Sequence, residues 1–367
     1  MTRETYILAG GGTGGHLYPG LAVADELVRL RPEAQIVMAC SNRAIDRRIL
    51  DGRTYAVVSQ PVRPLPRRPW QVPGFLLAWT ASRRQAAEMI ADLRPAAVLG
   101  LGGFAAAPLV RWAARAGVRC ALLNPDAVPG RANRYLARYA QAIFTQFDAT
   151  SLHFSVAQQG KLRSVGCPVR RELLDGGRSE ALRHFQLRDD RRTLLVFGGS
   201  LSAAAINDAV VALADEVATV RPRWQLLHVA GREADSAATA YERVGLAART
   251  LGYCDRMDLA YAAADLVLSR GGASTLAELT ATATPAVILP YPHHRDQHQR
   301  HNAEAMVAAE AALCVTDHRQ TAANVAALRE TLLPLLGDAD RLAAMQTAAQ
   351  GIGKPGAARR VAEWLVG

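Results

Sequence analysis

Short apolar runs alternate along the whole chain with longer stretches in which apolar residues recur every three or four positions. This pattern predicts buried strands that are each followed by an amphipathic helix. The runs of the first half cover residues 5–10, 34–40, 96–102, 119–124 and 142–146. The runs of the second half cover residues 193–200, 224–231, 264–272 and 285–292. Strands separated by helices predict right-handed βαβ units and therefore parallel sheets.

Both halves open with an apolar strand, a glycine turn and a helix, as in "ILAGGGTGGH" and "LLVFGGSLSAAAIND". A length of 367 residues also favours two domains over one core. We predict two Rossmann-like, doubly wound α/β domains, over residues 1–165 and 166–344, joined within the polar stretch 166–192. A last helix, about 345–367, is a candidate to pack back onto the first domain. Two such domains around a central cleft form the glycosyltransferase B fold.

The first glycine loop, "AGGGTGGHLYPG" at residues 9–20, satisfies the dinucleotide pattern G-x-G-x-x-G. Glycines let the backbone approach a diphosphate, and a helix N-terminus adds unpaired N–H groups and a positive dipole end. A dinucleotide site also requires a carboxylate at the end of the second strand. That strand ends instead in Ser41, Asn42 and Arg43, so binding of NAD is disfavoured.

His16 stands where the helix after this loop begins. The helix dipole disfavours its cationic form, so we expect a neutral imidazole at pH 7. A neutral imidazole beside a phosphate-binding loop can act as a general base. The alternative is a histidine that only caps the helix or packs under the loop.

In the second half, Glu278 follows a Gly-Gly turn early in a predicted helix, where its carboxylate could accept both ribose hydroxyls of a nucleotide. The alternative is a capping box, Thr275-x-x-Glu278, in which the glutamate bonds only the backbone. Ser200, at the second glycine turn, could hold a phosphate, or it could be an ordinary N-cap.

The run "HHRDQHQRHN", residues 293–302, gathers histidine, amide and carboxylate side chains. Such groups donate and accept hydrogen bonds, as a sugar with many hydroxyls requires. His294 and His298 have the i, i+4 spacing of metal ligands. The glutamate of H-E-x-x-H is missing and amides and arginines abound, so a metal site is disfavoured.

The net charge of +10 predicts an anionic partner: nucleic acid, an acidic lipid surface or a phosphorylated substrate. Nucleic acid is the weakest of these, because aromatic residues are not interleaved with the basic ones over most of the chain.

The five scattered cysteines form no C-x-x-C pair, which indicates reduced thiols in a cytosolic protein. We expect neither a signal peptide nor a spanning helix, because no apolar run reaches about 18 residues.

The stretch from Arg63 to Arg84 carries five arginines and no acidic residue. Its arginines flank an apolar group made of Trp70, Val72, Phe75, Leu76, Leu77 and Trp79. Basic residues around aromatic and aliphatic side chains favour attachment to an anionic bilayer. The alternative is a proline-rich loop leading into a helix whose apolar face packs on its own domain.

Six motifs together resemble the MurG family of bacterial N-acetylglucosaminyltransferases, which complete lipid II in peptidoglycan synthesis. They are "GGGTGGHLYPGLAVADEL", "LGLGGFAAAP", "DAVPGRANRYLARYA", "GGSLSAAAIND", "YAAADLVLSRGGASTLAEL" and "PYPHHRDQHQRHNA". The resemblance implies inverting transfer from UDP-N-acetylglucosamine, held by the C-terminal half, to undecaprenyl-diphosphoryl-MurNAc-pentapeptide, called lipid I. It also implies a peripheral enzyme on the cytoplasmic face of the bacterial plasma membrane. Neither a tightly bound cofactor or metal nor a nucleic-acid partner is expected.

The resemblance also assigns roles by position. His16 would take the proton of the attacking 4-hydroxyl. The acceptor diphosphate would meet Gly12, Thr13, Gly14 and Gly15. The donor would be bound by Asp126, Arg170, Ser200, Cys254, Arg270, Glu278, His298, Gln299 and Asn302, with Glu278 on the ribose and the backbone near Cys254 on the uracil. The membrane-facing residues would be Arg67, Arg68, Trp70, Phe75 and Trp79.

The chain departs from the family pattern at three places. Leu123-Asn124-Pro125-Asp126 stands where the family has His-Glu-Gln-Asn. Phe104 stands where the family motif GGYxSGP has tyrosine, and Ser202 stands where the motif GGSxGA has a glycine. Asn124 and Asp126 leave open a related transferase with another sugar or acceptor. A non-catalytic paralogue that binds UDP or lipid is a further alternative, disfavoured because His16, Thr13, Glu278 and Gln299 are retained.

Overall fold

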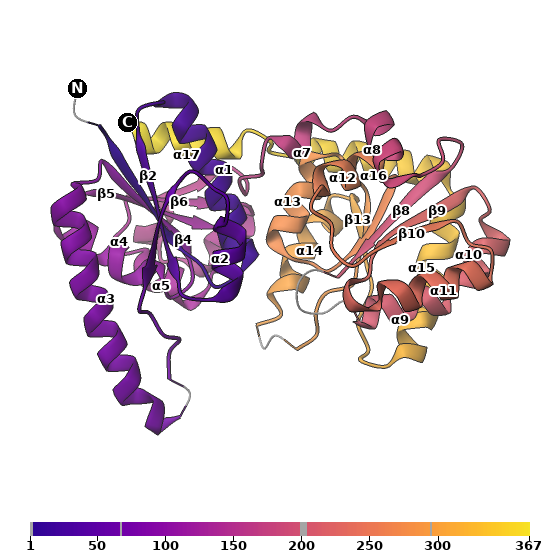
Figure 1. Ribbon diagram of the computed structural model, residues 1–367, viewed down its shortest axis with the longest axis horizontal. Coiled ribbons are helices and arrows are strands. Elements are labelled where there is room, and N and C mark those ends of the chain that lie inside the picture. The colour runs from indigo at the N-terminus through magenta and orange to yellow at the C-terminus, as the bar shows by residue number, and fades with distance from the viewer. Residues whose placement is uncertain (1–2, 67, 199–203, 294–295) are drawn as a thin grey trace. The chain divides into compact units, whose positions relative to one another are not determined.

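A computed structural model describes residues 3–66, 68–198, 204–293 and 296–367 (Figure 1). The chain forms two compact units. Unit 1 comprises Met1–Arg170 and Lys354–Gly367, and unit 2 comprises Arg171–Gly353. The sequence analysis placed the two limits at residues 165 and 344, which is five and nine residues earlier. The difference at the second limit arises because helix α16 (Ala339–Ile352) packs on α13 (Ala273–Ala281) of unit 2.

Unit 1 is built on a parallel sheet of seven strands in the order β3-β2-β1-β4-β5-β6-β7. The strands are β1 Thr5–Gly10, β2 Gln35–Ser41, β3 Ala56–Gln60, β4 Ala97–Gly102, β5 Arg119–Asn124, β6 Ala142–Thr145 and β7 Leu162–Ser164. Side chains of β1 alternate between two cores, as the period of a strand requires. Tyr6 and Leu8 face one core, whereas Ile7 and Ala9 face the other. Helices therefore cover both faces of this sheet.

The helices of unit 1 are α1 Gly14–Leu30, α2 Ala44–Leu50, η1 Pro69–Gln71, α3 Val72–Leu93, α4 Ala106–Arg115, α5 Arg131–Leu136, η2 Asp148–His153, α6 Val156–Gln159 and α17 Ala357–Val366. Helices α1 and α17 pack together over one face, and α3, α4 and α5 cover the other. Helix α3 is buried only from Ser82 onward. Its first half extends beyond the edge of the sheet (Figure 1).

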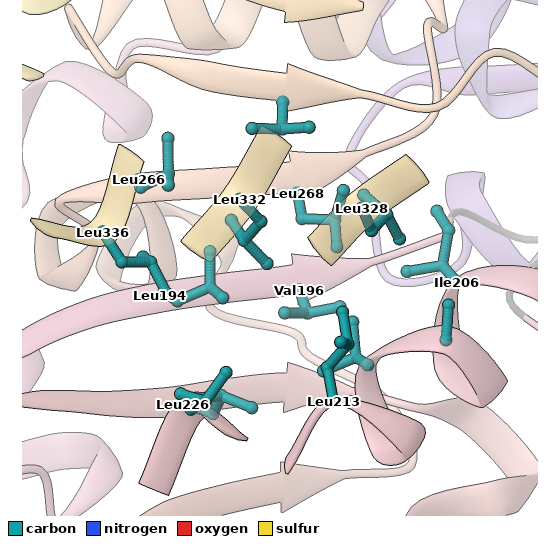
Figure 2. Packing of buried hydrophobic residues seen from close by; sticks show 14 of the residues in the cluster. Leu194, Val196, Ile206, Leu213, Leu226, Leu266, Leu268, Leu328, Leu332 and Leu336 are labelled. Atoms are coloured by element: carbon teal, nitrogen blue, oxygen red, sulfur yellow. The ribbon is translucent and has the colours of Figure 1, made fainter. Parts of the chain in front are cut away.

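Unit 2 is built on a parallel sheet of six strands in the order β10-β9-β8-β11-β12-β13. The strands are β8 Arg192–Phe197, β9 Trp224–Val229, β10 Ala248–Leu251, β11 Leu266–Ser269, β12 Ala286–Ile288 and β13 Ala312–Cys314. Leucines from the central strands and from α15 (Thr321–Gly337) form its core (Figure 2). Leu194, Leu266, Leu328 and Leu332 are 0–1% exposed, so these side chains are fully removed from water.

The remaining helices of unit 2 are α7 Glu172–Asp175, α8 Arg178–Phe185, α9 Ala204–Ala212, α10 Ala214–Val220, η3 Gly231–Glu233, α11 Ala234–Arg243, α12 Met257–Ala263 and α14 His298–Ala308. In each sheet the strand order reverses once along the chain, between β1 and β4 and between β8 and β11. The carboxyl ends at such a switch point form a crevice in which ligands bind. The prediction of two doubly wound parallel sheets is confirmed.

Candidate functional site

Two glycine loops lie against each other at the switch point of unit 1. Gly10 ends β1, and a β-carbon there would lie 2.6 Å from the Leu101 Cβ. Gly103, just after β4, has a φ of +72°, and its β-carbon would lie 2.8 Å from the Gly11 carbonyl oxygen. A side chain at Gly103 would therefore be strained and would also push the two loops apart.

His16 lies in the first turn of α1, as predicted, directly above this junction. Its Nδ1 is 3.2 Å from the Gly11 carbonyl oxygen and 3.2 Å from the Thr13 Oγ1. A carbonyl oxygen only accepts hydrogen bonds, so Nδ1 carries a proton, and in a neutral imidazole the lone pair then lies on Nε2. Thr13, not His16, is the N-cap of α1, so the interpretation of His16 as a helix cap is wrong. The ring is arranged to accept a proton at Nε2.

A buried carboxylate, which no motif indicated, lies beneath this loop. Asp46 of α2 is 0% exposed and accepts the Gly12 amide at 2.8 and 3.0 Å. It also accepts the Ser41 amide at 3.1 Å. The dinucleotide pattern places an acid at the end of β2. Asp46 was missed because it lies in α2, five positions after that strand ends. Since the Gly12 amide points inward, the loop offers an anion the first amides of α1, at Gly14 and Gly15, which have no partner within the helix.

Arg43 adds a positive charge to the same loop. Its Nη1 donates to the Gly12 carbonyl oxygen at 3.2 Å, and its guanidinium lies 5.4 Å from the centre of the Phe104 ring. Phe104 occupies the place of the family's tyrosine, and its ring face provides a cation–π contact that needs no hydroxyl. The arginine is thus held beside the glycine loop from both sides.

A buried amide lies next to His16 at the end of β5. The Asn133 side chain donates to the Leu123 carbonyl oxygen and to the Asn124 Oδ1, both at 3.0 Å. Asn124 in turn donates to the Asp126 carbonyl oxygen at 2.7 Å. The Asn133 Oδ1 is buried and lacks a partner among the described residues. A β-carbon added to Gly102 would lie 3.8 Å from this Asn133 oxygen and 3.0 Å from the His16 Nε2. Both polar atoms therefore lie beside Gly102.

Arg170 is the last residue of the first segment of unit 1. Its guanidinium lies 4.9 Å from the centre of the Tyr18 ring, one half-turn of α1 beyond His16. The structure therefore places Arg170, predicted on the donor side, with the residues around His16.

Ser200, the expected phosphate ligand of unit 2, lies outside the described residues, as do Ser202, His294 and Arg67.

In unit 2, Glu278 lies in the second turn of α13, after the switch-point strand β11. The N-cap of α13 is Gly272, so Thr275 is the third residue of the helix and cannot cap it. The capping-box interpretation is therefore wrong. The Glu278 Oε2 accepts a hydrogen bond from the Tyr261 hydroxyl at 2.8 Å, and the side chain is partly exposed. The carboxylate is fixed in orientation at the carboxyl edge of the sheet.

The start of α14 is bonded directly to the loop after β11. The Asn302 side chain, 0% exposed, donates to the Gly271 carbonyl oxygen at 3.2 Å. The Gln299 Oε1 accepts the Tyr291 amide at 2.9 Å. A β-carbon at Gly271 would lie 2.3 Å from the Gln299 carbonyl oxygen. Helix α14 thus reaches β11 only because residue 271 is glycine.

His298, the first residue of α14, is paired with a neighbouring carboxylate. Its Nδ1 lies 2.9 Å from the Asp296 Oδ1. Burial raises the pKa of Asp296, but the hydrogen bond and charge of His298 together with backbone hydrogen bonds lower it by more, so the pKa lies below the ordinary value. The structure brings His298, Gln299, Asn302 and Glu278 to the same carboxyl edge of the sheet. Cys254, after β10, is buried, and desolvation raises the pKa of its thiol to about 11, so it stays protonated.

A buried hydrogen-bonded chain that the sequence did not indicate links β9 to α9. The Tyr241 hydroxyl is 2.7 Å from the His228 Nδ1, and the His228 Nε2 is 3.0 Å from the Asn207 Oδ1. The Asn207 Nδ2 donates to the Ala230 carbonyl oxygen and to Glu233. Burial lowers the pKa of His228 to about 4. The neutral ring then joins the helix after the second glycine turn to the loop after β9.

Neither a metal-binding cluster nor a membrane-spanning helix occurs among the described residues. Within residues 3–66, 68–198, 204–293 and 296–367, histidine, cysteine and carboxylate side chains form no group of three that could hold a metal ion. In the same ranges, every helix is too short or too polar to cross a membrane.

Comparison with known proteins relates the whole chain to one family. Residues 6–145 match the glycosyltransferase family 28 N-terminal domain and residues 193–361 its C-terminal domain. The chain is 40% identical over 356 residues to a Leifsonia xyli protein named UDP-N-acetylglucosamine–N-acetylmuramyl-(pentapeptide) pyrophosphoryl-undecaprenol N-acetylglucosamine transferase, covering 95% of this chain and 94% of that protein. A Myxococcus xanthus protein of the same name is 33% identical, covering 98% and 92%.

Solved structures support the fold. The crystal structure of Acinetobacter baumannii MurG matches with a TM-score of 0.76 and 22% identity, covering 99% of each chain. The calicheamicin glycosyltransferase CalG4 matches with a TM-score of 0.63 and 16% identity, covering 100% of this chain and 99% of that one. The predicted fold class, two parallel-sheet domains of the glycosyltransferase B type, is confirmed.

The close approach at Gly271 predicts different effects of alanine at two adjacent glycines. Gly271→Ala brings a β-carbon against the backbone of α14, so we expect a loss of about 1–3 kcal/mol in the free energy of unfolding. Gly272→Ala is the matched control, because its β-carbon would lie 3.5 Å from its nearest neighbour, the Thr275 Oγ1. Urea unfolding of both variants checks this. Equal stability of the two would contradict the contact.

Proposed function

The chain belongs to glycosyltransferase family 28, and from this premise we propose that it transfers N-acetylglucosamine from UDP-N-acetylglucosamine to lipid I. The reacting group of lipid I is the 4-hydroxyl of MurNAc in undecaprenyl-diphosphoryl-MurNAc-pentapeptide, and the product is lipid II of peptidoglycan. The observation that carries the proposal is the His16 ring. Its Nδ1 is fixed by the Gly11 carbonyl oxygen, which leaves a basic Nε2 at the switch point of unit 1.

The acceptor binds to unit 1. The His16 Nε2 removes the proton of the 4-hydroxyl as its oxygen attacks the anomeric carbon of the donor sugar. The bond from that carbon to the diphosphate breaks, and UDP leaves with the electron pair. One displacement inverts the anomeric configuration and needs no covalent enzyme intermediate. The amides of Gly14 and Gly15 and the guanidinium of Arg43 lie where the acceptor diphosphate requires positive charge.

The donor binds to unit 2. The Glu278 carboxylate, oriented by Tyr261, accepts hydrogen bonds from the ribose hydroxyls. His298 and Gln299 face the sugar from the start of α14, and Asn302 keeps that helix on the loop after β11. The backbone near Cys254 meets the uracil, and Ser200 remains a predicted phosphate ligand. The transfer as written uses no resident cofactor or metal, and no nucleic acid takes part.

The end of β5 favours a second candidate, a related transferase with another sugar or acceptor. Asn124 replaces the family's carboxylate, and its side-chain nitrogen donates a hydrogen bond to the Asp126 carbonyl oxygen. An amide can neither take a proton nor repel a phosphate as a carboxylate does. A screen of UDP-sugar donors with purified lipid I analogue separates the two candidates.

The function is tested by transfer of labelled N-acetylglucosamine to a short-chain lipid I analogue. We expect His16→Ala to lower kcat by about 10²–10⁴, because a positioned general base contributes that much, while the variant still binds UDP-N-acetylglucosamine. His153→Ala, an exposed histidine of the same unit, is the control and should transfer normally. Undiminished transfer by His16→Ala would remove the proposed base.

We further propose that η1 and the first half of α3 attach the protein to the cytoplasmic face of the bacterial plasma membrane. Trp70 is 69% and Leu77 72% exposed, and the Arg68 guanidinium lies 5.1 Å from the centre of the Trp70 ring. Phe75 and Trp79 stack with ring centroids 6.4 Å apart. Trp79 packs partly on the core of unit 1, so the surface available to an anionic bilayer is made of the exposed side chains Trp70, Val72, Leu76 and Leu77. Arginines beside inserted apolar groups favour that partner.

The attachment is tested by sedimentation with vesicles that contain an anionic phospholipid. Trp70→Ser with Leu77→Ser should lower the bound fraction at least about tenfold, because each inserted apolar side chain contributes roughly 1.5–3 kcal/mol. Leu152→Ser with Val156→Ser is the matched control, since these side chains are 81% and 85% exposed elsewhere on unit 1. Equal sedimentation of both pairs would reject the surface.

A further inference from the structure

We propose that Asp317 is a positioning residue of the donor site, which holds Arg270 inside unit 2 and, through Arg270, fixes the segment that leads into α14. Arg270 then serves the reaction by fixing this segment. The proposal rests on the function proposed above, because it concerns how the donor-binding helix is placed.

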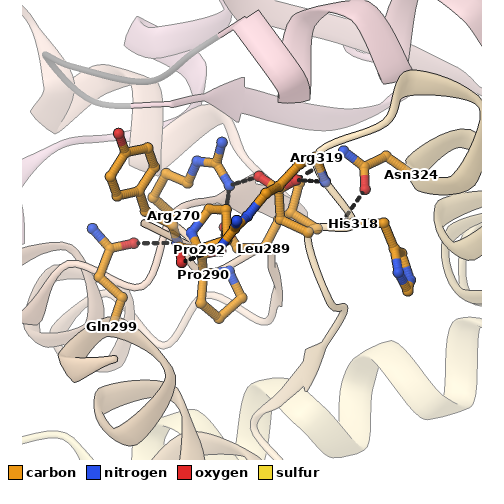
Figure 3. Close-up of polar contacts among 10 residues, drawn as sticks. Arg270, Leu289, Pro290, Pro292, Gln299, His318, Arg319 and Asn324 are labelled. Carbon is orange, nitrogen blue, oxygen red and sulfur yellow. Dashed lines mark hydrogen bonds and ion pairs between the residues drawn. The ribbon is translucent and has the colours of Figure 1, made fainter. Parts of the chain in front are cut away.

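Arg270 follows β11 directly and turns inward (Figure 3). Its side chain is only 6% exposed. The Arg270 Nη1 donates to the Asp317 Oδ2 at 2.8 Å and to the Leu289 carbonyl oxygen at 2.9 Å. The guanidinium also lies 5.7 Å from the centre of the Tyr291 ring. These contacts direct its charge into the protein, toward the strand end of β12.

Asp317 comes from the connection between β13 and α15, and its side chain is 3% exposed. Its Oδ1 accepts the Arg319 amide at 2.9 Å and the Asn324 side chain at 3.0 Å. Burial raises the pKa of Asp317, but the hydrogen bonds from Arg270, Arg319 and Asn324 outweigh burial and hold the pKa below its ordinary value. Both oxygens are thus occupied, and the carboxylate is charged when it pairs with Arg270.

The pair controls the segment from Leu289 to Pro292, which precedes α14. Arg270 holds its first residue through the Leu289 carbonyl oxygen. Arg319, oriented by its own amide on Asp317, donates from Nη2 to the Pro292 carbonyl oxygen at 3.0 Å. Between these two points, the Tyr291 amide donates to the Gln299 side chain of α14. Three hydrogen bonds therefore connect Asp317 to the start of α14: Asp317 to Arg270, Arg270 to Leu289 and, two residues along the segment, Tyr291 to Gln299.

A buried charge that loses its partner is costly, because desolvation is no longer offset. Asp317→Asn keeps the shape and the acceptor oxygen but leaves the Arg270 charge unpaired. The segment before α14 should then shift, and the donor should bind more weakly. The acceptor binds to unit 1, so its binding should not change. A split between the two KM values separates positioning of the donor site from a general loss of stability.

The test is a double-mutant cycle on the full-length enzyme with Asp317→Asn, Arg270→Met and the double variant. We expect each single change to raise KM for UDP-N-acetylglucosamine about tenfold, and the double variant to be no worse than Arg270→Met, since both act through one pair. KM for the lipid I analogue should stay within about twofold of wild type. Multiplying effects, or an unchanged donor KM for Asp317→Asn, would overturn the proposal in favour of direct phosphate binding by Arg270.

Two further variants keep the test decisive if Asp317→Asn folds poorly. Asn324→Ala removes one donor to Asp317 and keeps both charges, so the donor KM should rise by a smaller factor. Asp265→Asn is the matched control: Asp265 pairs with Arg178 at 2.9 Å at the opposite end of β11, and its loss should leave the donor KM unchanged. A donor KM unaltered by Asn324→Ala, or raised equally by Asp265→Asn, would count against Asp317.

Calorimetric binding of UDP-N-acetylglucosamine separates failure of this proposal from failure of the proposed function. A wild type that binds the donor without transferring it contradicts the function, and the same cycle in Kd still tests Asp317. A wild type that does not bind the donor overturns both.

Discussion

Close backbone approach at the two switch points is the constraint on which the rest of the structure depends. In unit 1, Gly103 meets the Gly11 carbonyl oxygen, and the space left by the missing β-carbon of Gly102 admits the His16 ring. In unit 2, Gly271 meets the Gln299 carbonyl oxygen, which lets α14 bond to the loop after β11. In both units, helix residues that we propose to face the ligands reach the carboxyl edge of the sheet because a side chain is absent there.

In each unit, a buried aspartate accepts hydrogen bonds from the loop that follows a strand at the switch point. Asp46 accepts the Gly12 and Ser41 amides, and Asp317 accepts Arg270 and the Arg319 amide. Loops at strand ends have backbone donors that no ladder satisfies, and an internal carboxylate is a strong acceptor for them. The consequence for function is a division of labour. Groups bonded to these aspartates hold the loops, and the groups beside them are those that we propose to face the ligands.

The central strands were predicted because both of their faces are buried, which produces continuous apolar runs. The edge strands β3, β7, β10 and β13 were missed, since they are short and much of their surface is exposed. Motifs placed His16 and Glu278 correctly on their helices. The same reasoning could not find Asp46 or Asp317, because each bonds a loop 34 or 47 positions away and carries no local pattern. The assignment of Arg270 to the donor came from the resemblance and stays a prediction, and its described contacts lie inside unit 2.

We propose that the donor binds to unit 2 and that unit 1 carries the catalytic base. Hydrogen–deuterium exchange with and without UDP-N-acetylglucosamine tests that assignment most directly. We expect the nucleotide sugar to slow exchange at residues 269–278 and at the start of α14. Slower exchange confined to the glycine loop at residues 10–16, with no change in unit 2, would contradict it.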